Sequence, residues 1–132
     1  MPRMEPTPTA LTRPFWDATR EQRLLVQWCD ACDAGIYYPR WACPTCLGTD
    51  LTWREASGRG ELYTFNVVHQ AANPMMGDMV PYVIALVDLD EGVRIVTNIV
   101  RTRDEDLKVG MAVAVAWEPL SDGRSLPVFR GA

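Results

Sequence analysis

Apolar residues occur in short runs separated by turn residues along most of the chain. From residue 60 onward these runs are rich in β-branched and aromatic residues, a composition typical of strands. The pattern predicts five strands, at residues 61–69, 82–89, 93–100, 111–117 and 126–130. A hairpin turn is expected at 90–92 and one helical turn at 104–107, after the third strand. This order predicts a small closed barrel of the OB type, with an open five-stranded sheet as the alternative.

The segment before residue 24 carries the one helical signal near the N-terminus. Thr12 is a suitable N-cap, and we expect the helix to end near Arg23. Phe15 and Trp16 would lie on the same side of this helix as Thr19, at four- and three-residue spacing from it. This aromatic face either packs on the core or docks onto a partner protein, and the sequence favours neither.

Four cysteines form two Cys-x-x-Cys pairs, Cys29 with Cys32 and Cys43 with Cys46. Two residues between cysteines allow one tight turn to direct both thiolates at one ion, and backbone amides in the turn can donate to the sulfurs. Two such pairs complete a tetrahedron of sulfur ligands, which zinc accepts readily. Because all four ligands are sulfur, no coordination position stays open for water, and the pattern predicts a structural ion. Iron could occupy the same cage.

Unligated cysteines or a redox pair are the alternatives to a metal site. A redox Cys-x-x-Cys normally stands alone near a βαβ pattern, and neither condition holds here. Gly35 and Gly48 lie just beyond the two pairs, where we expect the turns to need positive φ. The ribbon is too small to form a core without the ion, so Cys43→Ser should unfold it and release the metal.

These signals divide the chain into three parts: a flexible tail with a helix at 1–23, a zinc ribbon at 24–56 and an OB-fold barrel at 57–132. The predicted fold class is mainly β, with a short N-terminal helix and a rubredoxin-like zinc ribbon before a five-stranded OB-fold barrel.

Charge and hydropathy narrow the class of protein further. The formal net charge is −4 and no basic stripe is present, so we expect no nucleic-acid partner. No window approaches the ~18 apolar residues of a membrane span, and the Pro- and Thr-rich N-terminus lacks the apolar region of a signal peptide. We therefore expect a cytoplasmic protein without a membrane partner.

A single-stranded nucleic-acid-binding ribbon and barrel is the alternative function, since OB folds often bind oligonucleotides. Tyr63 and Phe65 fall on one strand face by the two-residue period, where they could stack on bases or fill the core.

Four side chains flank the expected ribbon–barrel junction: Arg40, Trp41, Arg54 and Arg59. Arginine grips phosphate or carboxylate with paired donors, so this group suggests an anionic ligand such as the nucleotide end of coenzyme A. Each residue taken alone is better explained as a surface residue, and only the group suggests a ligand. No Gly-rich phosphate loop accompanies them.

The segment 70–81 predicts a long loop between strands, a length that is often functional. It carries Met75, Met76 and Met79, which suit adaptable contact with a partner or could instead close the barrel end. His69 precedes the loop and is the only histidine. It could act as a general base in a small independent enzyme, the third hypothesis, or form a hydrogen bond at a strand end.

The order of the motifs resembles a known family, the acyl-CoA-associated proteins that join a zinc ribbon to an OB fold and were long catalogued as a domain of unknown function. The likeness covers roughly residues 12–130. The motifs are Pro14-Phe-Trp16, Leu25-Val-Gln-Trp-Cys29-Asp-Ala-Cys32, Tyr38-Pro-Arg40, Cys43-Pro-Thr-Cys46, Ser57-Gly-Arg-Gly60-Glu-Leu-Tyr63, Pro81-Tyr82, Val87-Asp-Leu-Asp-Glu-Gly92 and Val109-Gly110.

The resemblance implies a non-catalytic accessory subunit in a hetero-oligomer with a thiolase-like protein. Partners of this kind include acyltransferases, hydroxymethylglutaryl-CoA synthases and aldolases that shorten steroid side chains, and the accessory subunit supports their use of acyl-CoA. The metal site carries over through the four cysteines. No CoA-binding residue carries over. The CoA-binding candidates Arg40, Trp41 and Arg59 rest on the residues alone, as do the partner-contact candidates Phe15, Trp16, Met75, Met76 and Met79.

Overall fold

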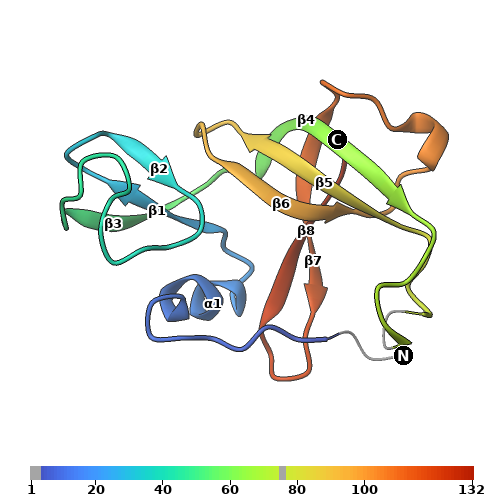
Figure 1. Cartoon of the computed structure of the whole chain (residues 1–132), viewed down its shortest axis with the longest axis horizontal. Helices are drawn as coiled ribbons and strands as arrows, with labels where there is room; N and C mark the ends of the chain where they lie inside the picture. The colour runs from blue at the N-terminus through green and yellow to red at the C-terminus, as the bar shows by residue number, and fades with distance from the viewer. Residues whose placement is uncertain (1–3, 75–76) are drawn as a thin grey trace.

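The computed structural model describes residues 4–74 and 77–132, which form a three-stranded sheet, a closed five-stranded barrel and one α-helix beside both (Figure 1). The mainly β prediction is confirmed. The ribbon and its helix comprise α1 (Arg13–Thr19), β1 (Leu25–Cys29), β2 (Ala34–Ile36) and β3 (Leu51–Glu55). The barrel comprises β4 (Arg59–Val68), β5 (Tyr82–Leu89), β6 (Arg94–Ile99), β7 (Ala112–Pro119) and β8 (Ser125–Gly131), with a 3-10 turn, η2 (Asp104–Asp106), after β6.

The barrel closes in the order β4-β5-β6-β8-β7, which confirms the OB-type barrel over the open sheet. Neighbouring strands are antiparallel except β6 and β8, which pair in parallel where Ile99 meets Phe129. Alternate residues of β5 and β6 are buried, and their side chains join apolar residues of the other strands in one core. Its most deeply buried side chains are Phe129, Leu62, Val87 and Val113.

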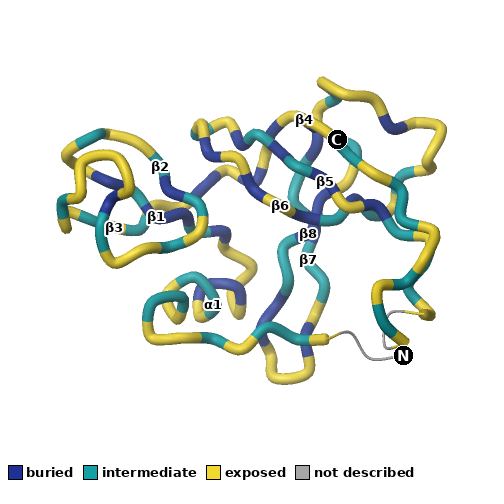
Figure 2. The backbone as a smooth tube through the Cα atoms, viewed as in Figure 1, coloured by how far each residue is buried: buried dark blue, intermediate teal, exposed yellow. Residues whose placement is uncertain are grey.

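The ribbon sheet has β1 in the middle, paired with β2 on one side and β3 on the other. Leu24 and Val26 are buried in the same cluster as the barrel core. Figure 2 shows this continuity, because the dark buried stretches run through the barrel strands and into β1, while much of the ribbon loops is exposed. Gly35 packs against Val93 of the barrel with no room for a Cβ atom. The ribbon is therefore held against the barrel by packing as well as by the chain.

The helix α1 is shorter than expected, since it ends at Thr19 and not near Arg23. Gln22 takes a φ of 56°, which lies outside the helical region and turns the chain toward β1. The buried Thr19 hydroxyl donates to the Trp16 carbonyl at 2.6 Å and accepts the N–H of Ser125 at 3.2 Å. Its bond to Ser125 ties the end of the helix to β8.

The expected cap at the start of the helix also differs from the structure. Thr12 precedes the helix but forms no side-chain cap bond. Its hydroxyl instead lies 3.1 Å from the Thr9 hydroxyl and accepts the Thr9 N–H at 2.9 Å. Before it, the Glu5 carboxylate accepts the hydroxyl of Ser121 at 2.8 Å, so the described part of the N-terminal segment contacts the β7–β8 turn.

The expectation that Tyr63 and Phe65 share a strand face is wrong. The pairing of β4 with β5 shifts register between Leu62 and Thr64, and such a bulge breaks the two-residue alternation. Phe65 consequently packs against the core, whereas Tyr63 is exposed beneath the Arg94 guanidinium, 3.4 Å from the ring centroid. Among the residues described, no helix is long and apolar enough to cross a bilayer.

Candidate metal centre

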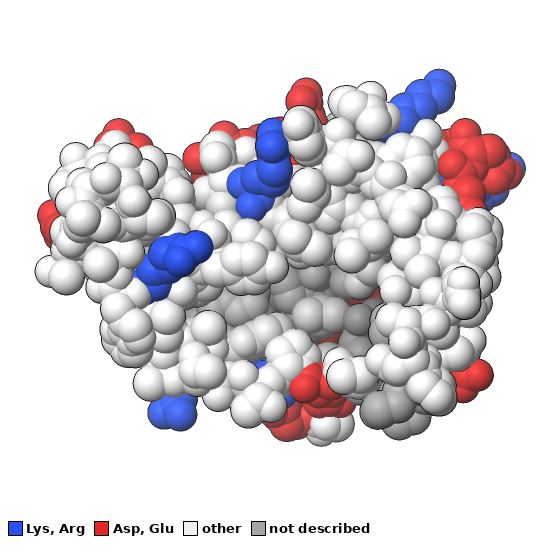
Figure 3. All heavy atoms as spheres, viewed as in Figure 1, with Lys and Arg blue, Asp and Glu red and all other residues white. Residues whose placement is uncertain are grey.

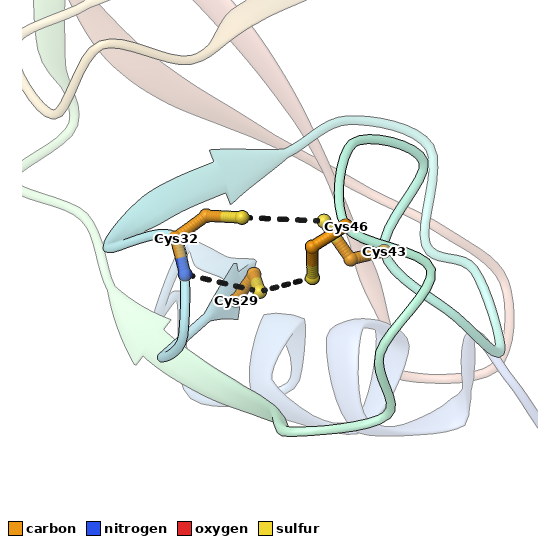
Figure 4. A group of neighbouring side chains, drawn as sticks. All are labelled: Cys29, Cys32, Cys43 and Cys46. Carbon is orange, nitrogen blue, oxygen red and sulfur yellow. Dashed lines mark hydrogen bonds between the residues drawn. The ribbon is translucent and has the colours of Figure 1, made fainter.

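The four cysteines lie on two turns that face each other across the ribbon. Cys29 ends β1 and Cys32 lies in the turn that leads to β2, while Cys43 and Cys46 lie in the loop before β3. Figure 4 shows the side chains of both pairs pointing toward one another. The ribbon sheet supports this arrangement by pairing Cys29 with Ala34 of β2 and with Leu51 of β3.

The positive φ angles of these turns occur one or two residues before the positions expected. Asp33 has a φ of 51° and Leu47 a φ of 62°, whereas neither Gly35 nor Gly48 has a positive φ. The chain reverses directly after each cysteine pair, and the Leu47 N–H donates to the Cys43 carbonyl at 2.8 Å to close the second turn. Gly48 follows and lies close to the Cys46 sulfur, since a Cβ atom added to Gly48 would be 3.3 Å from that sulfur.

The four sulfur atoms lie within 4.8 Å of one another, which positions them for a metal ion. The Cys29 and Cys46 sulfurs are 3.7 Å apart, and those of Cys32 and Cys43 are 4.0 Å apart. A tetrahedral ion with metal–sulfur bonds of about 2.3 Å has sulfur–sulfur edges of about 3.8 Å. A disulfide would need about 2.05 Å. The donor set therefore fits a tetrahedral metal such as zinc, and the cysteines are free thiols.

Backbone amides of both turns donate to the sulfurs, as expected. Cys29 accepts the N–H of Cys32, Cys43 accepts that of Thr45 and Cys46 accepts that of Gly48, each at 3.4 Å. These bonds favour the thiolate form and hold each sulfur in the orientation that coordination needs.

The thiols differ in pKa because the turn amides and the neighbouring sulfurs act unequally on them. Backbone N–H groups of Cys46 and Thr45 lower the pKa of Cys43 to about 6. The hydrogen-bonded sulfurs of Cys46 and Cys29, followed by burial, raise the pKa of Cys32 to about 12. Without an ion the cluster thus keeps protons on some sulfurs at neutral pH. Metal binding must release them, because only thiolates serve as ligands.

The first cysteine turn is braced by Asp30 and Thr52, which the sequence analysis did not single out, and by Arg54, which it considered only as an anion-binding candidate. Asp30 accepts hydrogen bonds from the Thr52 hydroxyl at 3.2 Å and from Arg54 Nη2 at 3.1 Å. The Arg54 guanidinium also lies 4.5 Å from the centroid of the Trp28 ring. Arg54 is therefore engaged within the ribbon and is less available to an external anion.

The loop after β2 is held by Gln27, and the only signal for this residue in the sequence is its place inside an apolar run. Its buried side-chain amide donates to the Arg40 carbonyl and accepts the Arg40 N–H, both at 2.8 Å. This paired contact fixes the backbone of Arg40. The side chains of Arg40 and Trp41 face solvent, and Trp41 is 72% exposed.

The remaining candidate residues lie apart from this loop. Arg59 is exposed at the start of β4, and the described contacts do not join it to Arg40 or Trp41. His69 is exposed just beyond the end of β4. Met79 is half-buried in the long loop, and Met75 and Met76 lie outside the described residues.

The aromatic face of the helix, for which the sequence favoured neither core packing nor partner contact, is half-buried. Phe15 packs against the barrel core cluster and meets Trp16 edge-to-face, with ring centroids 4.9 Å apart. Packing on the core is thus observed, and contact of the same residues with a partner stays a proposal.

Comparison with known proteins matches both halves of the chain to one family. The domain described as "ChsH2, rubredoxin-like zinc ribbon domain" matches residues 16–52, and "ChsH2, C-terminal OB-fold domain" matches residues 53–118. A solved structure described as "Ltp2-ChsH2(DUF35) aldolase" is similar with a TM-score of 0.83 and 35% identity, covering 96% of this chain and 98% of that one.

Two curated relatives are subunits of hydratases by name. The "Probable enoyl-CoA hydratase alpha subunit" of Thermomonospora curvata is 39% identical over 119 residues, 89% of this chain. The "3-oxo-4,17-pregnadiene-20-carboxyl-CoA hydratase alpha subunit" of Mycobacterium tuberculosis is 30% identical over 131 residues, 88% of this chain. The matched regions span only 37% and 40% of the lengths of these two relatives.

Proposed function

Since this chain belongs to the ChsH2 family of proteins that join a rubredoxin-like zinc ribbon to an OB-fold domain, we propose that it is a non-catalytic accessory subunit of a thiolase-like enzyme. The partner would be an acyltransferase or aldolase, and this chain would support its use of acyl-CoA. The observation that carries the proposal is the likeness, over nearly the whole chain, to the subunit of an aldolase described as Ltp2-ChsH2. Steroid side-chain thioesters are one candidate substrate, suggested by the pregnadiene-carboxyl-CoA relative.

Zinc is the proposed ion, held by Cys29, Cys32, Cys43 and Cys46, with a purely structural role. The four-sulfur set and its spacing suit zinc, and they leave no ligand position at which a substrate could bind. Iron in the same cage is the competing assignment. Metal analysis of the purified protein separates the two, because zinc gives a colourless protein whereas a four-sulfur iron site absorbs visible light.

A partner surface is proposed on the side that carries exposed apolar residues. Tyr38 and Leu47 of the ribbon are 60% and 77% exposed, and Ile84 and Val96 of the barrel are 41% and 42% exposed. Exposed apolar residues that stand alone are common on protein surfaces, but Tyr38 and Val96 line one depression and Ile84 and Val96 line another, and connected apolar surface of this kind is typical of a partner site. Figure 3 shows that the face between ribbon and barrel carries few charged residues. The helix residues Phe15 and Trp16 and the loop residues Met75, Met76 and Met79 remain proposed contacts.

A coenzyme A contact is proposed at Arg40 and Trp41, with Arg59 as a more distant candidate. Arg40 has a fixed backbone and an exposed side chain, and Trp41 offers an exposed indole beside it. A guanidinium pairs with phosphate and an indole stacks on adenine, so the two could hold the nucleotide end of the cofactor.

The proposal is tested by affinity purification of the tagged protein from its native cell extract, followed by mass spectrometry. We expect a thiolase-like protein to be recovered, and the activity of that partner on acyl-CoA to fall when this chain is omitted. A partner that is fully active and stable alone would contradict the accessory role. Recovery of nucleic acid or ribosomal proteins would instead favour the single-stranded nucleic-acid alternative, which predicts binding that weakens steeply with salt.

A further inference from the structure

A pocket of about 180 Å³ lies where the helix, the ribbon and the barrel meet. Its apolar lining includes Leu24 and Val26 near the start of β1, Ile36 of β2 and Ile95 of β6. All four of these side chains are buried, so this part of the lining belongs to the packed interior of the protein. In Figure 3 the surface is hollowed in the middle of this face.

Aromatic rings line the pocket from three separate elements. The helix contributes Phe15 and Trp16, the segment after β2 contributes Tyr37 and Tyr38, and β3 contributes Trp53. The helix rings form one edge-to-face pair, and the tyrosine rings form a second pair with centroids 4.4 Å apart and planes tilted by 32°. Both the exposed edges and the faces of aromatic rings are thus presented to one small space.

None of the described residues that line the pocket is charged. The polar side chains Thr12, Gln27 and Tyr37 already have partners within the chain, the Tyr37 hydroxyl donating to the Val96 carbonyl at 3.4 Å. Burial raises the pKa of Tyr37, so this hydroxyl stays neutral. The Tyr38 hydroxyl and the indole N–H groups of Trp16 and Trp53 are the other polar groups of the lining, and all three are neutral. An ionised group would therefore lose its hydration here without meeting an opposite charge, so the lining favours a neutral ligand.

We propose that this pocket binds a neutral aromatic ring, as the buried part of a small-molecule ligand. The volume suits one ring, since an apolar cavity of roughly 150 Å³ takes up benzene. Aromatic neighbours add an interaction beyond the burial of area, which a puckered aliphatic ring or a chain does not obtain. Binding of a ring by this pocket does not depend on the proposed acyl-CoA role. If both hold, the ring would be the end of the acyl group.

The test uses the full chain with its metal and two soluble probes, benzyl alcohol and cyclohexylmethanol. Both carry the same hydroxymethyl group, but only the first has a planar aromatic ring. In an NMR titration we expect saturable shifts at residues around the pocket, and affinity for benzyl alcohol about two- to tenfold higher than for cyclohexylmethanol. Absence of saturable shifts, or equal affinity for the two alcohols, would overturn the proposal.

Matched variants locate the site. Val96→Phe places a ring at the pocket wall, whereas Ile84→Phe makes the same kind of change at a similarly exposed barrel position outside the pocket lining. We expect Val96→Phe to weaken benzyl alcohol binding at least about tenfold and Ile84→Phe to leave it unchanged, because filling a cavity excludes its occupant. Equal loss in both variants would show that the alcohol binds elsewhere.

A second pair of variants tests the ring contacts without filling the pocket. Tyr38→Leu keeps an apolar wall but removes one ring, so the preference for benzyl alcohol should shrink while cyclohexylmethanol still binds. Trp41→Leu removes an exposed ring of the same loop that does not line the pocket, and the preference should persist. A preference that survives Tyr38→Leu in full would contradict the proposed selection by aromatic contacts.

Benzoyl-CoA and free CoA distinguish this inference from the proposed function. Tighter binding of benzoyl-CoA than of CoA, lost in Val96→Phe, would support the pocket as an acyl site. Binding of benzyl alcohol without any gain for benzoyl-CoA would keep the ring site and show that it does not hold the acyl group, while the accessory role is tested separately by affinity purification.

Discussion

Replacing Cys43 by serine tests the metal centre most directly. Cys43 is 2% exposed and lies in a small cluster with Cys29 and Ile36, apart from the barrel core. A serine hydroxyl is a poor metal ligand at neutral pH, so three sulfurs would remain and the ion would be held weakly or lost. We expect the two cysteine turns to unfold while the barrel, which has its own core, stays folded.

The size of the effect follows from what the turns bury. Structural zinc contributes about 10–16 kcal/mol of binding free energy in zinc-finger peptides at pH 7, so its loss removes the main support of the ribbon. The barrel loses chiefly the contribution of ribbon residues such as Val26, which is buried in the same cluster as the barrel core and whose full burial is worth about 2 kcal/mol. For a chain of this length that corresponds to a fall in Tm of about 6–10 °C.

Metal content by mass spectrometry, thermal melting and an amide NMR spectrum together measure this outcome. Thr45→Ala is the matched control, because it changes an exposed residue of the same turn and keeps the N–H that donates to Cys43. The control should retain one ion per chain and the native Tm. If Cys43→Ser also kept a full equivalent of metal and melted like the native protein, the four-sulfur assignment would be wrong.

Three further outcomes follow from individual contacts. Gln27→Leu should lower stability by about 1–3 kcal/mol in urea unfolding and speed hydrogen exchange of the Arg40 amide, because both backbone groups of Arg40 lose their partner. Phe129→Ala should cost about 3–5 kcal/mol by the same assay, since Phe129 is fully buried in the barrel core and the cavity would be central; a loss below 1 kcal/mol would contradict the role given to it. The hydrogen bond from Arg94 lowers the pKa of Asp88, so their stabilisation is present above about pH 3.9 and is lost as pH falls through the lower folded-state value. Asp88→Asn should accordingly lower Tm at pH 7, and this effect should shrink as pH falls below about 3.9 and the carboxyl becomes protonated in the folded state; an effect of equal size at pH 7 and at low pH would refute the linkage.

The class of fold was largely predictable because its signals are local. Each barrel strand was marked by its own apolar run and bounding turn residues, and the cysteine spacing identified a metal cluster without reference to any other segment. The hairpin at 90–92 and the helical turn at 104–106 were equally local. The motif order then extended this to the family, which matches the same residues.

Local reasoning was less successful where two segments decide one conformation. The bulge in β4 depends on its pairing with β5, so the alternation of Tyr63 and Phe65 could not reveal it. The hydroxyl of Thr19, at the end of the helix, accepts the N–H of Ser125 more than 100 residues later, and no local pattern could indicate that contact. In the cysteine turns, positive φ fell on Asp33 and Leu47 because the geometry of each reversal outweighed the usual preference for glycine.

The sequence by itself determined which residues are apolar, which carry thiols and in what order they occur, and these properties specify strands, a barrel and a metal cluster. The tertiary structure alone decided which surfaces those elements share. Gln27 reaches the backbone of Arg40, and five aromatic residues from three elements surround one pocket, only because the ribbon and helix pack against the barrel. Such contacts arise between segments distant in the chain, where hydrophobic burial selects the arrangement and no local pattern encodes it.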